Sequence, residues 1–339
     1  MPATIVIKKA LSSFLKACGL FSALEHYRLR NKAFVLMYHR VLTPDKKNAL
    51  YVQPGMYVTD SSFERQISFL KKKYRILFLE ELIGKINRHE NVGGCCAITF
   101  DDGWRDNYTN AFPVLKKFRA PATIFLATSY IGTNRLFWTD EICLMIEQFP
   151  MLRNEFKDVS PLVLKFHREI GSNPSGNRDI FLHTVLEVLK KYSPHEREEI
   201  LAYYRRGGES PCLPREMLRW EEAAEMGKSG LVAFGAHTAE HEILDQVPIA
   251  KVRTEIMQSR EIIGRRLGVN ACTFAYPNGN YNQDIQKILL EKHFVGAVTT
   301  RKGFLGHNTP LMEIPRIGIH EDISGTVPLF QGRILLEKF

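Results

Sequence analysis

Short apolar runs rich in β-branched and aromatic residues recur along the sequence, and a segment with helical spacing follows most of them. This alternation is typical of βα units, in which helices connect the strands of a parallel sheet. Seven runs are close to the strand number of an α/β barrel. The expected strands are Phe34–Tyr38, Cys95–Phe100, Ala122–Ala127, Leu231–Gly235, Cys272–Tyr276, Val295–Thr299 and Met312–Ile319.

Helices are expected between these strands. The first begins at the capping residues Asp60–Ser62, and Phe63, Ile67 and Leu70 then share one face. Gly268 stands where a helix commonly ends. The expected helices are Phe63–Tyr74, Glu80–Ile86, Tyr108–Phe118, Arg215–Lys228, Ile249–Leu267 and Gln283–His293.

The chain has 339 residues, and α/β barrels of roughly 250 residues routinely form one unit. We therefore expect one barrel domain over residues 34–339. A charged stretch with helical patterning at about residues 138–214 breaks the βα rhythm. It is interpreted as an inserted helical segment, which serves either as a lid or substrate wall or has no role in function.

Residues 1–33 form a basic amphipathic segment, with lysines at positions 8, 9 and 16 among apolar residues. The segment is compatible with peripheral membrane contact, or with a helix packed on the domain's own surface. It contains neither the roughly 20 consecutive apolar residues of a membrane span nor a signal-peptide pattern. We expect a location in the cytoplasm or at the cytoplasmic face of a membrane.

The net charge of +9 arises from 46 Lys and Arg against 37 Asp and Glu. Such an excess attracts nucleic acids, anionic lipid head groups or acidic glycans. The basic residues are scattered and accompany no zinc-knuckle or helix-turn-helix pattern, so no nucleic-acid partner is expected. The six cysteines form no CxxC pair, which argues against a cysteine zinc site and suits a reducing compartment.

Two neighbouring carboxylates, Asp101 and Asp102, follow the expected strand Cys95–Phe100 directly. Carboxylates at the carboxyl end of a parallel strand stand where α/β barrels place their active sites. Asp-Gly is also a common turn pair, so this feature alone is equally compatible with a structural turn.

Two histidines four positions apart, His237 and His241, follow another expected strand. Residues i and i+4 of a helical turn share a face, so both imidazoles can meet one ion. Two His and one Asp leave coordination positions open for water and substrate, as in a catalytic metal site. Because both polar pairs follow strands, we expect them on the same rim of the barrel.

Other catalytic classes lack their patterns. Zinc proteases require Glu directly after the first His of the pair, and Thr238 stands there. The sequence also contains no GxSxG, GxGxxG or P-loop pattern.

Five ordered motifs together resemble those of the polysaccharide deacetylase family, the NodB-homology enzymes of carbohydrate esterase family 4, and most closely its branch that acts on poly-N-acetylglucosamine. The resemblance covers about residues 34–319 apart from the insertion. It implies an α/β fold, a distorted (β/α) barrel, and a hydrolase that removes N-acetyl groups from an N-acetylhexosamine in a glycan or lipid-linked sugar. The motifs are VLMYHRV at 35–41, TFDDGW at 99–104, PATIFL at 121–126, FGAHTAEH at 234–241 and FAYPNGNY at 274–281.

The resemblance also implies roles for individual residues. One divalent ion is expected on Asp102, His237 and His241, with zinc as the first choice and cobalt, nickel or manganese as alternatives. Asp101 corresponds to the general base. His39, at the end of the first strand, corresponds to the acid that protonates the departing amine.

The loop that begins at Tyr276 and Pro277 matches the family's oxyanion loop, so the backbone N–H of Asn278 is expected to stabilise the tetrahedral oxyanion. Trp104, next to the carboxylates, is expected to stack on a sugar ring, and Tyr276 is a further candidate for such stacking. The family carries an arginine that orients the base where this chain has Ala275. Arg316, in the last expected strand, is hypothesised to reach the rim and replace it.

Two further interpretations stay open. The same metal site could deformylate or O-deacetylate a related carbohydrate, or the barrel could bind carbohydrate without catalysis. The complete set of Asp and His residues argues against the silent barrel. The expected partner is an N-acetylated carbohydrate substrate, and no oligomeric state is predicted.

Overall fold

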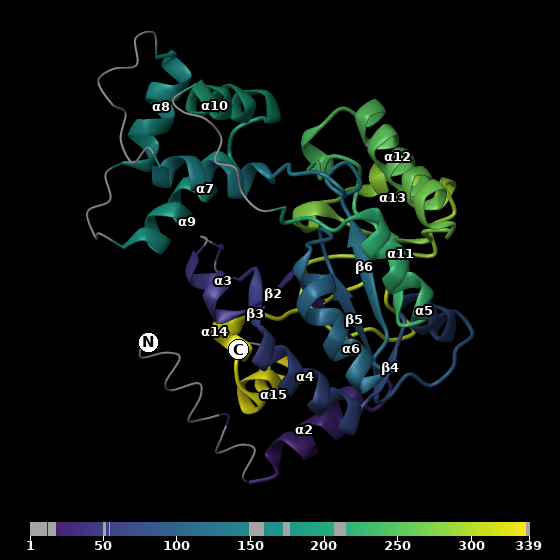
Figure 1. Cartoon of the computed structure of the whole chain (residues 1–339). Helices are drawn as coiled ribbons and strands as arrows, with labels where there is room; N and C mark the ends of the chain where they lie inside the picture. The colour runs from purple at the N-terminus through teal and green to yellow at the C-terminus, as the bar shows by residue number, and fades with distance from the viewer. Residues whose placement is uncertain are drawn as a thin grey trace. The chain divides into compact units, whose positions relative to one another are not determined.

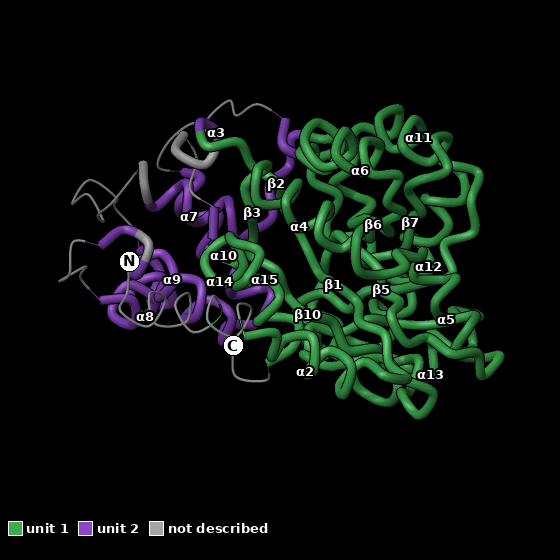
Figure 2. The backbone as a smooth tube through the Cα atoms, turned by 90° about the horizontal axis from the view of Figure 1, so that it is seen from below, with its two compact units in different colours: residues 1–44, 55–133, 217–339 green, residues 45–54, 134–216 purple. Residues whose placement is uncertain are grey.

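The structure is a computed structural model that describes residues 18–49, 52–53, 55–148, 159–171, 177–206 and 215–336, together with Ser12. The chain divides into two compact units (Figure 2). The first comprises Met1–Pro44, Gly55–Thr133 and Met217–Phe339, and the second comprises Asp45–Pro54 and Asn134–Glu216.

A parallel sheet with the strand order β10-β1-β5-β6-β7-β8-β9 forms the centre of the first unit, and β4 pairs with β5 beside this path. Figure 1 labels β4, β5 and β6 of this sheet. Ile314 forms a parallel bridge with Val298 of β9, and β10 follows it and pairs with β1. The last segment thus connects the two edges of the sheet, as in the predicted distorted (β/α) barrel. The strands are β1 (Phe34–Tyr38), β4 (Arg75–Leu77), β5 (Cys95–Phe100), β6 (Ala122–Leu126), β7 (Val232–Ala236), β8 (Thr273–Ala275), β9 (Gly296–Val298) and β10 (Ile317–Gly318).

The central strands are apolar throughout because both of their faces are covered. Every residue of β5 and of β6 is buried. Beneath one face, Leu82 and Ile83 of helix α5 belong to the same buried cluster as Val35 and Ala97 of the sheet. Burial on both sides makes these strands readable in the sequence as continuous apolar runs.

Most of the helices that were predicted in the first unit lie close to their expected places, whereas the helices at Glu321–Ser324 and Val327–Leu335 were not predicted. The helix predicted at 215–228 is the clearest exception: it begins at Trp220, because Met217 forms an antiparallel bridge with Trp104 and holds the preceding backbone extended. A π-helical turn at Asn107–Ala111 precedes α6. The helices are α2 (Leu20–Leu29), α4 (Asp60–Lys73), α5 (Leu79–Asn87), α6 (Phe112–Phe118), α11 (Trp220–Lys228), α12 (Ile249–Leu267), α13 (Gln283–Glu291), α14 (Glu321–Ser324) and α15 (Val327–Leu335).

Two short strands and one helix lie outside the barrel pattern and were not predicted. Strand β2 (Arg40–Leu42) pairs in parallel with β3 (Tyr57–Thr59). Helix α3 spans Pro44–Ala49.

The second unit is helical and contains the stretch predicted as an insertion at 138–214. Its helices enclose a core of their own, in which Ile142, Phe166, Leu186 and Ile200 are buried. The role of this unit as a lid or wall stays a prediction. Its helices are α7 (Trp138–Gln148), α8 (Pro161–Ile170), α9 (Arg178–Leu189) and α10 (Pro194–Arg206).

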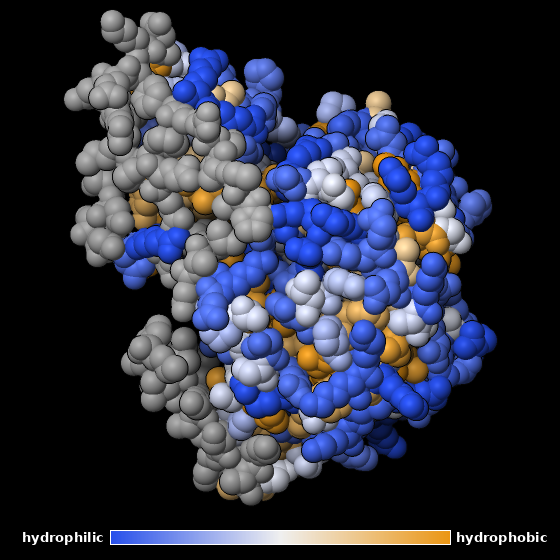
Figure 3. All heavy atoms as spheres, viewed as in Figure 1, coloured by the Kyte–Doolittle hydropathy of each residue, from blue (hydrophilic) through white to orange (hydrophobic). Residues whose placement is uncertain are grey.

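Only the last part of the predicted amphipathic segment 1–33 is well described. Helix α2 buries Phe21 and Leu29 and packs against α15, while residues 1–11 and 13–17 lie outside the described residues. The expected membrane contact of that segment stays a prediction. Among the described helices, none has the length and apolar character needed to cross a bilayer. Hydrophilic residues predominate on the described part of the face in Figure 3.

Candidate active site

The chemically active side chains follow the ends of neighbouring strands. His39 follows β1, Asp101 and Asp102 follow β5, and His237 follows β7. The parallel register pairs the last residues of β1 and β5, and pairs the last residue of β7 with β8. These residues therefore lie at one edge of the sheet, as predicted from the sequence.

Asp102, His237 and His241 form one cluster whose potential ligand atoms all lie within 4.8 Å of one another. Oδ1 of Asp102 is 3.3 Å from Nε2 of His237 and 3.4 Å from Nε2 of His241. Burial raises the pKa of Asp102, but its hydrogen bonds to the two histidines outweigh burial and lower that pKa well below the ordinary value. The carboxylate is thus ionised at neutral pH.

Two contacts turn these ligand atoms towards each other. Nδ1 of His237 lies 2.8 Å from the carbonyl oxygen of Ala275, so a neutral imidazole that donates Nδ1–H there carries its lone pair on Nε2. The indole N–H of Trp104 donates to Oδ2 of Asp102 at 2.8 Å, which leaves Oδ1 on the histidine side. Both are contacts of the kind that orient metal ligands.

This donor set fits a divalent transition-metal ion. Two imidazole nitrogens and one carboxylate oxygen match the preferences of zinc and of its neighbours cobalt and nickel. His241 keeps 22% of its side chain exposed, whereas Asp102 and His237 are buried. The cluster is therefore accessible to solvent on the side of His241, as a catalytic site requires.

Trp104 is in the interior rather than at the substrate face. Its side chain is only 2% exposed, which leaves no ring face for the sugar stacking predicted from the sequence. The Arg40 guanidinium lies 4.2 Å from the centre of the indole and pairs with Asp106 at 2.9 Å. The ring thus packs against Arg40, and its N–H fixes the orientation of the Asp102 carboxylate.

The loop that carries the histidines has an unusual backbone. Thr238 and His241 both have positive φ, at 62° and 55°, a conformation that is unfavourable for β-branched and bulky residues. Glu255 of α12 accepts the backbone N–H groups of Ala239 at 2.9 Å and Glu240 at 2.7 Å through one oxygen. This fully buried carboxylate holds the loop in the shape that brings His241 to His237.

Asp101 binds Arg316, as hypothesised from the position of Arg316 in the sequence. The two guanidinium Nη atoms donate to the two carboxylate oxygens at 2.7 Å each, and Nε donates to the carbonyl of Thr299 at 2.9 Å. Burial raises the pKa of Asp101, but the charge and hydrogen bonds of Arg316 outweigh it and hold that pKa below the ordinary value. Asp101 is therefore an oriented carboxylate.

His39 lies on the other side of Asp101, with Nε2 3.9 Å from Oδ2. Burial lowers the pKa of His39, and the carboxylates of Asp102 and Asp101 act in the opposite direction without cancelling the effect. An imidazole beside Asp101 and Asp102 can exchange a proton with a group bound there.

The predicted oxyanion loop is a short 3₁₀ turn, Pro277–Gly279, directly after β8. The N–H of Asn278 lies in its first turn, where backbone donors have no partner within the helix. Tyr276 is 1% exposed and donates its hydroxyl to the carbonyl of Met312 at 3.0 Å, so it anchors the loop rather than facing a sugar. Gly279 has φ +79°, and a Cβ there would lie 2.1 Å from Oγ1 of Thr300.

Three supporting residues were missed from the sequence. Glu255 carried a signal: it lies on the buried face of α12 with Val252, Ile256 and Ser259, where a charged residue needs a specific partner. Arg40 and Asp106 lie close to motifs but show no spacing pattern that would pair them.

The chain matches one protein family and several individual known proteins. A family model described as polysaccharide deacetylase matches residues 89–295. The poly-beta-1,6-N-acetyl-D-glucosamine N-deacetylase of Staphylococcus epidermidis is 38% identical over 210 residues, which cover 60% of this chain and 71% of that protein. The putative polysaccharide deacetylase YxkH of Bacillus subtilis is 20% identical, over 86% of this chain and 73% of its own length.

Solved structures share the fold at low sequence identity. The Streptococcus pyogenes deacetylase PplD, in complex with acetate, has a TM-score of 0.58 and 21% identity, covering 90% of this chain and 98% of that one. IcaB from Ammonifex degensii has a TM-score of 0.55 and 19% identity, covering 89% of this chain and 97% of that one.

Proposed function

Because the chain belongs to the polysaccharide deacetylase family and is thus a hydrolase of non-peptide carbon–nitrogen bonds, we propose that it removes N-acetyl groups from N-acetylhexosamine units of a glycan or lipid-linked sugar. Poly-N-acetylglucosamine is the first candidate substrate, since the Staphylococcus epidermidis relative is named for that activity.

One observation carries the proposal: the two adjacent carboxylates have different partners. Asp102 faces His237 and His241, whereas Asp101 is held by Arg316. This arrangement supports a division of labour in which one carboxylate binds an ion and its neighbour stays free to accept a proton.

A divalent ion held by Asp102, His237 and His241 would polarise the acetamide carbonyl and lower the pKa of water bound there. Asp101, ionised and oriented by Arg316, accepts the proton of the attacking water. The backbone N–H of Asn278 donates to the carbonyl oxygen as negative charge develops on it.

The departing amine needs a proton, because an amide anion is a very poor leaving group in water. His39 stands beside Asp101 and is the imidazole that we assign to this transfer. Asp101 removes one proton from water, and protonated His39 supplies one proton to the amine nitrogen. The two transfers balance, and the products are free amine and acetate.

The proposal is tested by mass spectrometry of N-acetylated β-1,6-linked glucosamine oligosaccharides after incubation with the zinc-loaded protein. We expect acetate and the corresponding free amine, and no product from the Asp102→Asn variant. Release of formate from N-formyl substrates, or of acetate from O-acetylated sugars alone, would assign the site to one of the two alternative reactions. Binding of oligosaccharide without any product would favour the silent barrel.

A further inference from the structure

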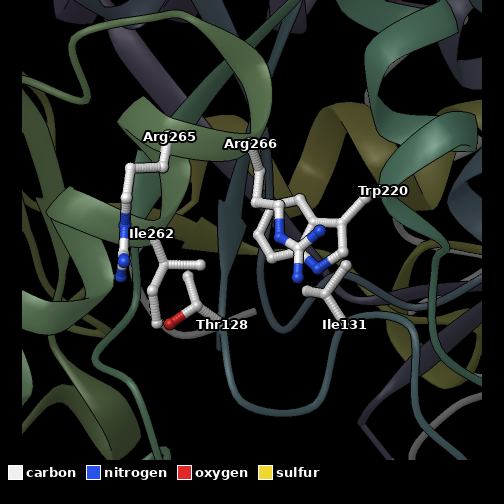
Figure 4. A pocket seen from close by; sticks show the side chains of 6 residues that line it. All are labelled: Thr128, Ile131, Trp220, Ile262, Arg265 and Arg266. Carbon is white, nitrogen blue, oxygen red and sulfur yellow. The ribbon is translucent and has the colours of Figure 1, made fainter.

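A pocket lies in the first unit, beside the active-site loops. Its volume is about 550 Å³, within the roughly 300–1,000 Å³ of small-molecule sites. It is lined by Thr128, Ile131, Trp220, Ile262, Arg265 and Arg266, shown in Figure 4. We call it the Trp220 pocket.

Two arginines give this pocket its charge. Arg265 and Arg266 extend from α12 towards the side on which Thr128 and Ile131 lie (Figure 4). Both are exposed, and neither forms an ion pair within the described part of the chain. Glu261, one helical turn before Arg265, is likewise not paired with it. Two uncompensated guanidinium groups at one pocket favour an anionic ligand.

The ring of Trp220 supplies an apolar wall. Its indole lies over Gly132, where a Cβ would be 3.5 Å from the ring. The guanidinium of Arg266 lies 5.9 Å from the ring centre. Ile131 and Ile262 complete the apolar lining. An aromatic ring beside cationic groups can bind the partly apolar face of a pyranose while the cations bind its charged substituent.

The buried hydroxyl of Thr128 is a separate observation that indicates a bound ligand. The residue is 3% exposed, and its hydroxyl Oγ1 has no hydrogen-bond partner among the described residues. A buried hydroxyl without a partner is unfavourable by about 1–3 kcal/mol. Because Thr128 lines the pocket, a polar group bound there can supply the missing partner.

The pocket is connected to the active site through the backbone. The N–H of Thr128 donates to the carbonyl of Thr238 at 3.3 Å, and Thr238 directly follows His237. The N–H of Ala127, the preceding residue, donates to the carbonyl of Asp102 at 3.4 Å. A sugar in the pocket would thus lie next to the two loops that carry the three metal-ligand candidates, Asp102, His237 and His241.

We propose that the Trp220 pocket is a glycan subsite for a pyranose that carries a phosphate or carboxylate group. Trp220 stacks on the ring, Arg265 and Arg266 bind the anionic group, and Thr128 hydrogen-bonds to the sugar. This inference rests on the proposed function, and it adds to the N-acetylhexosamine substrate an anionic sugar residue near the cleaved acetamide, a group that unmodified poly-N-acetylglucosamine lacks.

The chain's three tryptophans allow a direct test. In the ¹⁵N-labelled full-length protein, each indole N–H gives one NMR resonance, assigned with Trp→Phe variants: Trp104 reports on the metal cluster, Trp138 on the second unit and Trp220 on the pocket. The probes are glucose 6-phosphate, glucuronate, glucose and inorganic phosphate. We expect saturable shifts of the Trp220 resonance with the first two, which also separate phosphate from carboxylate as the preferred group.

Glucose and inorganic phosphate should each bind at least about tenfold more weakly than the tighter-binding of the two charged sugars. Glucose lacks the anionic group, and inorganic phosphate lacks the sugar ring. The Arg265→Ala/Arg266→Ala double variant should bind the charged sugars more weakly by a similar factor. Lys72→Ala/Lys228→Ala is its matched control, since both lysines are exposed, lie outside the pocket and carry the same total charge. Thr128→Val should weaken binding, whereas Thr128→Ser should retain it. Unchanged Trp104 and Trp138 resonances verify that each variant is folded.

Three results would overturn the subsite: glucose binding as tightly as the charged sugars, inorganic phosphate binding as tightly as glucose 6-phosphate, or the lysine control losing as much affinity as the arginine variant. Acetate release from the N-acetylated oligosaccharides is measured on the same preparation. Release without probe binding rejects the subsite alone. Probe binding without release rejects the proposed deacetylation and still supports the pocket as a site for charged sugars.

Discussion

The guanidinium of Arg316 binds both carboxylate oxygens of Asp101 at 2.7 Å, although 215 residues separate the two in the chain. A bidentate pair of this kind fixes the plane of the carboxylate as well as its charge. Arg316 also donates to Thr99 and to the backbone of Thr299, so the arginine is itself held rigidly. The proposed base therefore has one orientation and a lowered pKa.

Replacing Arg316 by Gln should move the acid limb of kcat/KM to higher pH. A base acts only when deprotonated, so the lowered pKa of Asp101 keeps the native enzyme active down to low pH. Without the arginine, burial still raises the pKa of Asp101, and only the smaller effects of His237 and His39 oppose it. The pH profile of acetate release measures the shift. Arg316→Lys keeps the charge and should shift the limb less; equal profiles for native and Gln enzymes would contradict the role.

Trp104→Phe should weaken metal binding by about 10–100-fold, because it removes the N–H that orients Asp102. The ring volume largely remains, so the packing against Arg40 is kept. Zinc affinity is measured by competition with a chelator. Trp138→Phe, in the second unit, is the control. If both variants bound zinc as the native protein does, the indole would not act on the ligand.

Removing the metal with a chelator should abolish acetate release, and zinc should restore it. An ion that binds only the folded chain also raises the unfolding midpoint, by an amount that grows with ion concentration. The measurement is thermal unfolding with and without zinc. Asp102→Asn should lose the response, whereas Asp284→Asn, at an exposed ion pair with Lys287, should keep it. A midpoint independent of zinc would count against the site.

His39→Asn should lower kcat for amide hydrolysis by about 10²–10⁴-fold, the usual contribution of a general acid. An aryl acetate releases a phenolate that needs no proton, so the same variant should lose far less activity on it. The two rates are compared in one preparation with its zinc content measured. Equal losses on both substrates would assign His39 a structural role instead.

Gly279→Ala should lower kcat without lowering the zinc content, because a Cβ would collide with Thr300 and displace the loop that carries the N–H of Asn278. Gly230 also has a positive φ, but a Cβ there meets nothing within 4 Å. Gly230→Ala therefore measures the backbone strain alone. Similar activity of the two variants would show that the loop position does not matter for catalysis.

The strands that the sequence predicted are those whose signal is local. The runs at Phe34–Tyr38 and Cys95–Phe100 are apolar because both faces of the sheet are covered, and their ends are where polar residues begin. Strands β2, β3 and β4 have three residues each. Three residues are too few to show periodicity, and the equally short β8 and β9 were predicted only because longer apolar runs contain them.

Trp104 shows why proximity in sequence does not determine a role. It lies two residues after Asp102, and this proximity predicted a place beside the substrate. Backbone φ angles of 76° at Asp102 and 83° at Gly103 turn the chain there, and the indole enters the interior against Arg40. Whether a side chain after a strand faces solvent or core depends on such turns and on the elements packed around them.

The sequence by itself determined the parallel α/β architecture and the candidate residues Asp101, Asp102, His237 and His241, because strand ends and close spacings are encoded over short stretches. The family resemblance implied different roles for the two carboxylates, and only the tertiary structure shows the contacts that separate them. Arg316 and Glu255 act across large sequence separations, and the direction of an indole or a guanidinium is set by packing. Long-range contacts of this kind leave no local pattern, so the chain must fold before Asp101 and Asp102 acquire different partners.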